Sequence, residues 1–386
     1  MHLALALAIV AGLAFTAVAY LLLVRRFYRL SGERPERLLA CTKDGWSIAV
    51  HRRRAPARRF AQPVLLCHGL ATNHLNFDFQ PPYSLAHALA EAGFDVYSLD
   101  WRGAGDSRPP RGRGRFAFDA DDLIHQDAPA VLDLVLQEAH AEELFWVGHS
   151  LGGLVGYAVL GGAEGKRVRG LCSLGAPVYF HYPRWLALLM RACTWLAWPV
   201  AFRQRLLSLA CAPFVGHLTL PLSDVLVNPK AIAPKVLRSI YANLIDSMGY
   251  RLLRQLDDWT RHDRFCSRDA ATDYRARLSH VTRPVLVLGG TKDGLAPPKA
   301  IHGQAALLGS VDKTVMLFGK ENGDQLEYGH GDLLFGVGAP SEVYPRIVAW
   351  VAKRATLLEV KGGDSQESQG PLAAGASAAL GTAGLP

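Results

Sequence analysis

The chain has 386 residues, of which 50% are hydrophobic, and this is enough for one large domain with an insertion. Its net charge of +8 comes largely from arginine clusters that no nucleic-acid motif accompanies. Solvated arginines, or a face held near anionic lipid headgroups, therefore explain the charge better than a nucleic-acid partner does. The six cysteines show no zinc-binding spacing, so we expect buried free thiols rather than disulfides or metal ligands.

The N-terminal segment predicts a membrane anchor over residues 1–29. Residues 3–24 carry no charge and are followed by Arg25, Arg26 and Arg29, and about 20 apolar residues suffice to span the hydrocarbon core of a bilayer. Because the arginines follow the span, the positive-inside rule places the rest of this single-pass chain in the cytoplasm. Export by a cleaved or uncleaved signal peptide is the alternative, because residues 17–19 resemble a cleavage site; against it, no basic segment precedes the apolar run.

Strand and helix patterns then alternate along the chain. Residues 37–42 and 46–51 flank a Lys-Asp-Gly turn, which predicts a β-hairpin. Strands that alternate with helices predict an α/β fold with a mostly parallel, doubly wound sheet covered on both faces. The further strands are expected at residues 63–67, 94–99, 144–147, 168–174, 284–288 and 314–317, and helices at 84–92, 119–140, 154–160 and 343–354.

The alternation breaks between residues 178 and 281, which are rich in leucine and tryptophan and lack a strand pattern. We expect this stretch to form an inserted helical cap over the sheet. The last residues consist mainly of Gly, Ala, Ser and Gln without an apolar period, which is typical of disorder. The predicted organisation is an anchor at 1–29, the first part of the core at 37–177, the cap at 178–281, the second part of the core at 282–356 and a disordered tail at 361–386.

A Gly-His-Ser-Leu-Gly sequence at residues 148–152 lies between a predicted strand and a predicted helix. A serine on such a turn adopts a strained backbone conformation, and its hydroxyl is exposed above the sheet. Gly148 and Gly152 let the chain turn tightly and let the helix pack closely. The amide of Leu151, at the helix N-terminus, can donate to a developing oxyanion. The pentapeptide alone is common by chance, but this context makes Ser150 the candidate nucleophile.

A serine hydroxyl needs a base to take its proton and a third group to orient that base. In this type of site the order along the chain is serine, acid, histidine. Asp293 lies in a glycine-rich loop directly after the strand predicted at 284–288, where catalytic groups collect. Asp312 and Asp324 are rivals, but neither directly follows an apolar strand. His330, on a glycine-flanked loop after the last strand, is the predicted base.

The second oxyanion amide is expected in the loop after the first core strand, at residues 68–70. The sequence there is His68, Gly69 and Leu70, so the amide of Leu70 is the predicted partner of the Leu151 amide. We expect His68 to support the loop by hydrogen bonding rather than to transfer protons. The site implies no metal ion and no organic cofactor.

Together these motifs resemble the α/β-hydrolase superfamily over residues 37–354. Residues 99–107 are similar to the family's Asp-x-Arg-Gly-x-Gly-x-Ser loop, and residues 68–74 and 118–130 resemble the lipase and esterase branch near acid lipases. The same features also resemble polyester synthases and depolymerases. The synthases use cysteine as nucleophile, and dehalogenases and epoxide hydrolases use aspartate, so the resemblance with Ser150 implies hydrolysis of esters.

The sequence therefore predicts a membrane-anchored serine hydrolase that cleaves carboxylic esters through an acyl-enzyme. The anchor and the apolar cap favour lipid or other hydrophobic acyl esters as substrates. An acyltransferase or thioesterase with the same three residues is the first alternative, and a binding protein that keeps the fold without activity is the second. The oligomeric state and the natural substrate stay open at this point.

Overall fold

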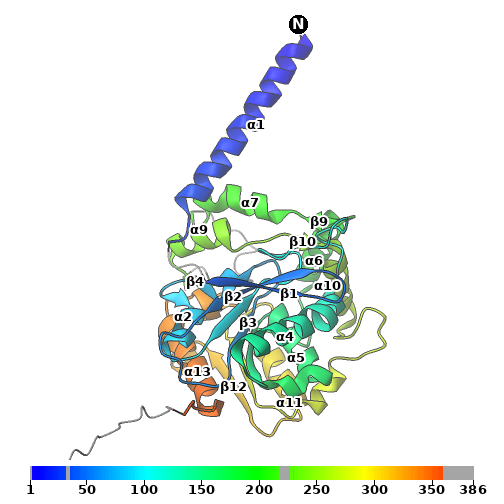
Figure 1. Cartoon of the computed structure of the whole chain (residues 1–386). Helices are drawn as coiled ribbons and strands as arrows, with labels where there is room; N and C mark the ends of the chain where they lie inside the picture. Colours follow the sequence, from blue (N-terminus) through cyan, green and yellow to red (C-terminus); the bar gives the residue numbers. More distant parts are fainter. Residues whose placement is uncertain (1, 32–34, 218–226, 229, 360–386) are drawn as a thin grey trace, which may run out of the picture.

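A computed structural model describes residues 2–31, 35–217, 227–228 and 230–359 (Figure 1). Its central element is an eight-stranded sheet in the order β1-β2-β6-β3-β7-β8-β11-β12. β2 pairs antiparallel with β1 and with β6, and all neighbours from β6 to β12 are parallel. The strands are β1 (Glu36–Cys41), β2 (Ser47–Arg53), β3 (Val64–Cys67), β6 (Val96–Leu99), β7 (Leu144–His149), β8 (Val168–Leu174), β11 (Val285–Gly290) and β12 (Lys313–Phe318). The predicted α/β fold and its hairpin are confirmed.

Helices cover both faces of the sheet because its parallel strands are buried on both sides. In β3, Leu65 and Cys67 face one hydrophobic core, whereas Val64 and Leu66 face the other. The first core is completed by α4 (Ala128–Ala139), α5 (Leu151–Leu160) and α11 (Pro298–Leu307), and the second by α2 (Leu85–Glu91) and α13 (Ala339–Arg354). A short helix, α12 (Asp332–Phe335), precedes α13, and β4 (Asp78–Gln80) and β5 (Tyr83–Ser84) form a small antiparallel pair before α2.

The prediction of one continuous helix at residues 119–140 is wrong, because the helix is interrupted. It consists of α3 (Ala120–Asp122), a π-helical segment at Leu123–Asp127, and α4. Pro129 lies in the first turn of α4 and has no amide hydrogen to continue a regular α-helical ladder. The buried Asp127 at this junction accepts a hydrogen bond of 2.8 Å from Nε of Arg102.

Residues 178–281 contain the predicted helices. They are α6 (Arg184–Ala197), α7 (Gln204–Cys211), α9 (Pro234–Asn243) and α10 (Tyr250–His262). The stretch also contains two short strands that the sequence pattern did not indicate, β9 (Ala201–Phe202) and β10 (Met248–Gly249), which form a two-stranded antiparallel sheet. Strands of two residues are too short to produce an alternating apolar pattern in the sequence.

The N-terminal helix α1 (His2–Phe27) projects away from the rest of the described chain (Figure 1). It is long and apolar enough to cross a membrane, and the same length and composition also fit a signal sequence. All six cysteines are free thiols, but the expectation that they are buried holds only for Cys67, Cys172 and Cys266. Cys41 and Cys211 are exposed, and Cys193 is partly exposed. The predicted disordered tail at 361–386 lies outside the described residues.

Candidate active site

Ser150 occupies a sharp turn between β7 and α5. Its backbone has φ 52° and ψ −117°, a combination that costs a residue with a side chain about 1–3 kcal/mol. A Cβ atom on Gly148 would lie 2.4 Å from the backbone oxygen of Gly152, and one on Gly152 would lie 2.0 Å from that of Cys67. Both positions therefore require glycine, and α5 packs directly against the end of β3. The Ser150 amide donates to the backbone oxygen of Leu174 over 2.8 Å, which ties the turn to β8.

Asp293 and His330 lie together at the carboxyl ends of β11 and β12. Nδ1 of His330 is 2.9 Å from Oδ2 of Asp293, and the Asp293 side chain is completely buried. The other carboxylate oxygen, Oδ1, accepts hydrogen bonds from the amides of Leu295 and Ala296 at 2.8 and 2.7 Å. These contacts fix the carboxylate. When Nδ1 carries the proton that bonds to Asp293, the lone pair of the neutral ring is on Nε2, which is the position a general base requires.

His149 connects the serine turn to the His330 loop. Its Nε2 lies 3.2 Å from the backbone oxygen of His330, and the two rings are 4.7 Å apart. Burial, together with the neighbouring His330, holds the pKa of His149 well below its usual value. A neutral ring has one N–H, so it donates to one acceptor at a time. Among the described residues, no hydrogen bond joins the Ser150 hydroxyl to His330, and this contact often tightens only when substrate binds.

The loop after β3 has its own hydrogen bonds. The Trp101 amide donates to Nε2 of His68 over 3.0 Å, and Nδ1 of His68 is 2.8 Å from the backbone oxygen of Gly69. Burial lowers the pKa of His68, so the ring is neutral and bridges the two backbone groups. The Gly69 amide donates to Oδ1 of Asn76 over 3.1 Å. These contacts agree with the supporting role expected for His68.

Leu70 and Leu151 line the same small cavity, of about 30 Å³. Their amides donate to no acceptor within the described part of the chain. A Cβ atom on Gly69 would lie 3.3 Å from Cβ of Ser150, so the loop passes directly over the serine. The volume corresponds to about one water molecule.

Three neighbours of the predicted residues were missed in the sequence. Gly175 has φ +54°, and a Cβ atom there would lie 3.1 Å from both Oδ2 of Asp293 and Nδ1 of His330. Its position directly after an apolar strand was a usable signal. Oδ1 of Asn76 lies 3.1 Å from Nδ1 of His149, but no sequence motif indicates Asn76. His149 was missed because its role depends on its contact with the distant loop that carries His330.

A second cluster of histidines and a carboxylate lies apart from Ser150. Oδ2 of Asp100 is 3.0 Å from Nε2 of His51, and Oδ1 is 3.0 Å from Nδ1 of His74. The Asp100 oxygens also accept the amides of His74 and Asp106 at 2.7 and 2.8 Å. The spacing of these side chains would suit a metal ion, but the carboxylate is already satisfied by four hydrogen-bonding groups. We interpret the cluster as a hydrogen-bonded structural support for the loop at residues 99–107.

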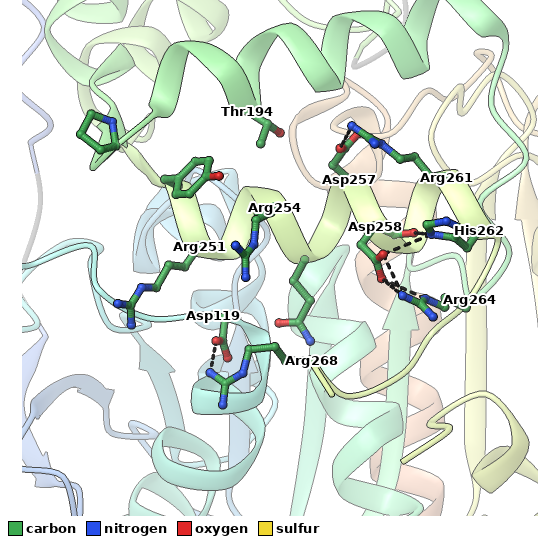
Figure 2. A pocket seen from close by; sticks show the side chains of 13 residues that line it. Asp119, Thr194, Arg251, Arg254, Asp257, Asp258, Arg261, His262, Arg264 and Arg268 are labelled. Carbon is green, nitrogen blue, oxygen red and sulfur yellow. Dashed lines mark hydrogen bonds and ion pairs between the residues drawn. The ribbon is translucent and has the colours of Figure 1, made fainter. Parts of the chain in front are cut away.

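A larger cavity, of about 850 Å³, lies against α10 (Figure 2). It shares no lining residue with the Ser150 site. Most of its charged side chains are paired with one another; for example, Arg261 contacts Asp257 and Arg264 contacts Asp258, each at 2.7 Å. The residues around Ser150 are therefore the candidate active site.

The sheet order, the serine turn and the adjacent histidine–aspartate pair define a hydrolase of the α/β class. The chain belongs to the alpha/beta hydrolase fold family, whose model matches residues 62–319. It is a carboxylic ester hydrolase related to lipases and esterases, which confirms the resemblance seen in the sequence.

The similar proteins cover different shares of the chain. Gastric triacylglycerol lipase of Rattus norvegicus is 26% identical over an alignment 356 residues long, which covers 81% of this chain and 87% of that protein. Lipase member K of Homo sapiens is 32% identical over an alignment 127 residues long, which covers 30% of this chain and 32% of that protein. Among solved structures, a soluble variant of monoglyceride lipase from Saccharomyces cerevisiae has a TM-score of 0.59 at 18% identity, covering 85% of this chain and 98% of that one. An esterase from Thermogutta terrifontis has a TM-score of 0.56 at 17% identity, covering 83% and 100%.

Proposed function

We propose that Ser150, His330 and Asp293 form a catalytic triad that hydrolyses carboxylic esters through an acyl-enzyme. The observation that carries the proposal is the 2.9 Å pair between Nδ1 of His330 and Oδ2 of Asp293, next to a serine held in a strained turn. A serine needs both a base and an oriented base to act as a nucleophile. The three side chains come from three loops at the same edge of the parallel sheet, where catalytic groups collect.

In the proposed reaction, Oγ of Ser150 attacks the ester carbonyl carbon while Nε2 of His330 takes the hydroxyl proton. Asp293 stays ionised and stabilises the imidazolium that forms. The tetrahedral intermediate then collapses, the alcohol leaves with the proton from His330, and Ser150 keeps the acyl group. Water, deprotonated by His330, attacks the acyl-enzyme, and collapse of the second intermediate releases the acid and returns the proton to Ser150.

The amides of Leu70 and Leu151 are the proposed donors to the oxyanion. Both line the small cavity and have no acceptor among the described residues, so they can bond to the negative charge as it develops. Removal of one such donor typically lowers turnover by about 10²–10³-fold. Gly69 lets the loop approach Ser150 closely, and Gly148 and Gly152 do the same for the serine turn.

The proposed substrates are lipid or other hydrophobic acyl esters. Two features support this class: an apolar N-terminal helix that can hold the domain beside lipid, and large apolar side chains on the segment proposed as the cap. The similarity to proteins described as triacylglycerol and monoglyceride lipases points the same way. No nucleic-acid partner is part of the proposal.

We further propose that residues 1–29 form a single-pass anchor, 178–281 a cap, and 37–177 with 282–356 the catalytic core. The arginines after the apolar run favour a cytoplasmic catalytic domain. If a protease added outside intact cells removes the catalytic domain, the protein is exported and this topology is wrong.

Hydrolysis of p-nitrophenyl esters tests the function. We expect Ser150→Ala and His330→Ala each to lower kcat/KM by at least about 10⁴-fold, while His302→Ala, an exposed histidine on α11, serves as the matched control with parent activity. Parent-like activity of Ser150→Ala would overturn the mechanism. p-Nitrophenyl esters of increasing acyl length then test the proposed substrate class. Cleavage of the acetate alone would contradict the proposal that hydrophobic acyl esters are the substrates.

A further inference from the structure

Large apolar side chains are exposed on one part of the segment proposed as the cap. Elsewhere among the described residues after α1 and outside this segment, such side chains are single, as at Leu39, Val311 and Val337, or form one pair, at Leu357 and Leu358. Here they follow one another along the end of α6, the β9 connection, α7 and the turn after it. The cap surface comprises Trp195, Trp198, Val200, Leu206, Leu207 and Phe214, each at least 53% exposed.

The orientation of α7 is the reverse of that expected for a helix on a water-facing surface. Such a helix turns its apolar side chains toward the core and its polar side chains outward. In α7, Ser208 is the buried residue, and its hydroxyl donates to the backbone oxygen of Tyr241 over 2.8 Å. Leu206 and Leu207 are 59% and 60% exposed. The outer side of α7 is therefore suited to an apolar environment.

α7 also packs against the last turns of α1. The Tyr20 hydroxyl donates to the backbone oxygen of Ala210 over 2.7 Å, and Val24 is only 5% exposed. Asn243 on α9 donates to the backbone oxygen of Tyr28 over 2.8 Å. Figure 1 shows α7 lying across the end of the domain from which α1 emerges. These contacts fix the position of α7 along the axis of α1.

The length of α1 determines how close the bilayer comes to α7. Residues 2–18 are exposed throughout, and protein contacts begin at Ala19. The apolar stretch from 3 to 18 spans only about 24 Å at 1.5 Å per residue, whereas the hydrocarbon core is about 30 Å thick. At 1.5 Å per residue, about 20 residues span the core, so the span must extend past residue 18 to about residue 22 and must include Tyr20. Because the Tyr20 hydroxyl contacts Ala210 of α7, α7 lies at the boundary of the hydrocarbon.

We propose that the cap surface inserts into the bilayer leaflet next to the C-terminal end of α1, at the level of the headgroups and the first acyl carbons. This inference rests on the proposed anchoring of the chain by α1. Exposed Arg191 and Arg203 flank the apolar side chains and can reach lipid phosphates, a combination typical of interfacial helices. Insertion of the cap surface would let an ester move from that leaflet to the site without crossing bulk water.

Environment-sensitive thiol labels test the insertion directly, because Cys211 ends α7 and Cys41 lies on β1, both exposed. Burial raises the pKa of the Cys67, Cys172 and Cys266 thiols, so they react poorly. The full chain would be reconstituted in phosphatidylcholine vesicles as three variants, all carrying Cys193→Ser. One retains Cys211 (Cys41→Ser), one retains Cys41 (Cys211→Ser), and one carries Ala11→Cys with Cys41→Ser and Cys211→Ser.

We expect a label on Cys211 to be blue-shifted and quenched by lipids that carry a nitroxide near the headgroup. The label on Cys41 should be unaffected by these lipids, and the label at Ala11→Cys should be quenched by a nitroxide deep in the acyl chain. If the label at Ala11→Cys is quenched but the label on Cys211 is not, insertion of the cap surface is overturned, whereas anchoring by α1 is supported. Unquenched labels at both positions would overturn the anchor and the proposal together.

Activity provides a second readout. The double variant Leu206→Asp/Leu207→Asp should lower hydrolysis of an ester embedded in vesicles by at least tenfold and leave hydrolysis of soluble p-nitrophenyl butyrate within twofold of the parent. Leu357→Asp/Leu358→Asp, another consecutive pair of exposed leucines, is the matched control and should change neither rate. No loss on the vesicle ester, or equal losses on both esters, would contradict the proposal. Only an inactive parent on the soluble ester would challenge the proposed chemistry itself.

Discussion

Two clusters in this molecule pair a buried aspartate with histidine, but their surroundings differ. Asp293 contacts His330 and the amides of Leu295 and Ala296. Asp100 likewise accepts two backbone amides, but it contacts two histidine rings, which stack with their centroids 3.6 Å apart. Both carboxylates are thus fixed by the backbone and bonded to imidazole.

The two clusters differ in the groups that lie next to their histidines. His330 is linked through His149 to the turn that carries Ser150, whereas both rings of the Asp100 cluster are directed at the same carboxylate. A histidine–aspartate pair alone is therefore no sign of catalysis. We propose that the strained serine turn beside it gives the pair its chemical role, and the following variants separate the two clusters.

The largest difference is expected from Asp293→Asn. An amide at this position can stabilise the wrong tautomer of His330 and carries no charge to balance an imidazolium, so we expect kcat to fall by about 10⁴-fold. Asp312→Asn is the control, because Asp312 contacts Arg354 away from the site and should leave kcat unchanged. Steady-state hydrolysis of a p-nitrophenyl ester measures both, and equal effects of the two variants would contradict the assignment.

A smaller effect is expected from Gly175→Ala. The added methyl group would press on the Asp293–His330 pair at 3.1 Å, and we expect kcat to fall roughly 10²-fold, in line with the effect of small misplacements of catalytic groups. Gly112→Ala shares the unfavourable positive φ but meets no atom within 4 Å. Both variants should lose stability by roughly 1 kcal/mol, and only Gly175→Ala should lose activity. Loss of activity in both would show that backbone strain alone explains the effect.

Asn76→Ala should have a weaker effect still. It removes the acceptor of the Gly69 amide and the partner of His149, so the oxyanion loop becomes less well positioned. We expect kcat to fall about tenfold, the equivalent of about 1.4 kcal/mol, with little change in KM. Asn76→Asp keeps the acceptor oxygen and should recover part of the rate. A change in KM alone would mean that Asn76 affects binding rather than the reaction.

The smallest effect on activity is expected in the other cluster. Burial opposes protonation of His74, but Asp100 outweighs it and raises the pKa of His74. Such a histidine stabilises the fold fully below its unfolded pKa of about 6.5 and loses this contribution as the pH rises through its folded pKa. We expect the unfolding free energy of the parent to exceed that of His74→Gln by more at about pH 6 than at about pH 9, with kcat within about threefold.

Urea denaturation at the two pH values measures this difference in detergent solution. A stability difference that is unchanged or larger at the higher pH would contradict the sign of the pKa shift. A loss of kcat as large as that of Asp293→Asn would mean that the two clusters do not have separate roles.

The sequence predicted the core of the fold better than its surroundings. Each apolar run of the sheet is a strand in the structure, because buried parallel strands leave an uninterrupted apolar signal. The serine turn was also visible, since Gly148 and Gly152 are required by contacts with neighbours close in the chain or in the adjacent strand.

The contacts between distant loops could not be predicted in this way. Asn76 and His149 meet across 73 positions of the chain, and no local pattern encodes such a contact. The outward direction of Leu206 and Leu207 was hidden for a similar reason. A helix composed of apolar and polar residues predicts an amphipathic element, but only the packing determines which side faces the protein.

The central claim is that Ser150 is the nucleophile, and covalent labelling tests it most directly. The full chain would be treated with a fluorophosphonate, which reacts with activated serines, and the modified peptide would be identified by mass spectrometry. We predict a single adduct on Ser150, strong reduction in His330→Ala, and none in Ser150→Ala. An adduct on another residue, or equal labelling of the parent and Ser150→Ala, would contradict the account.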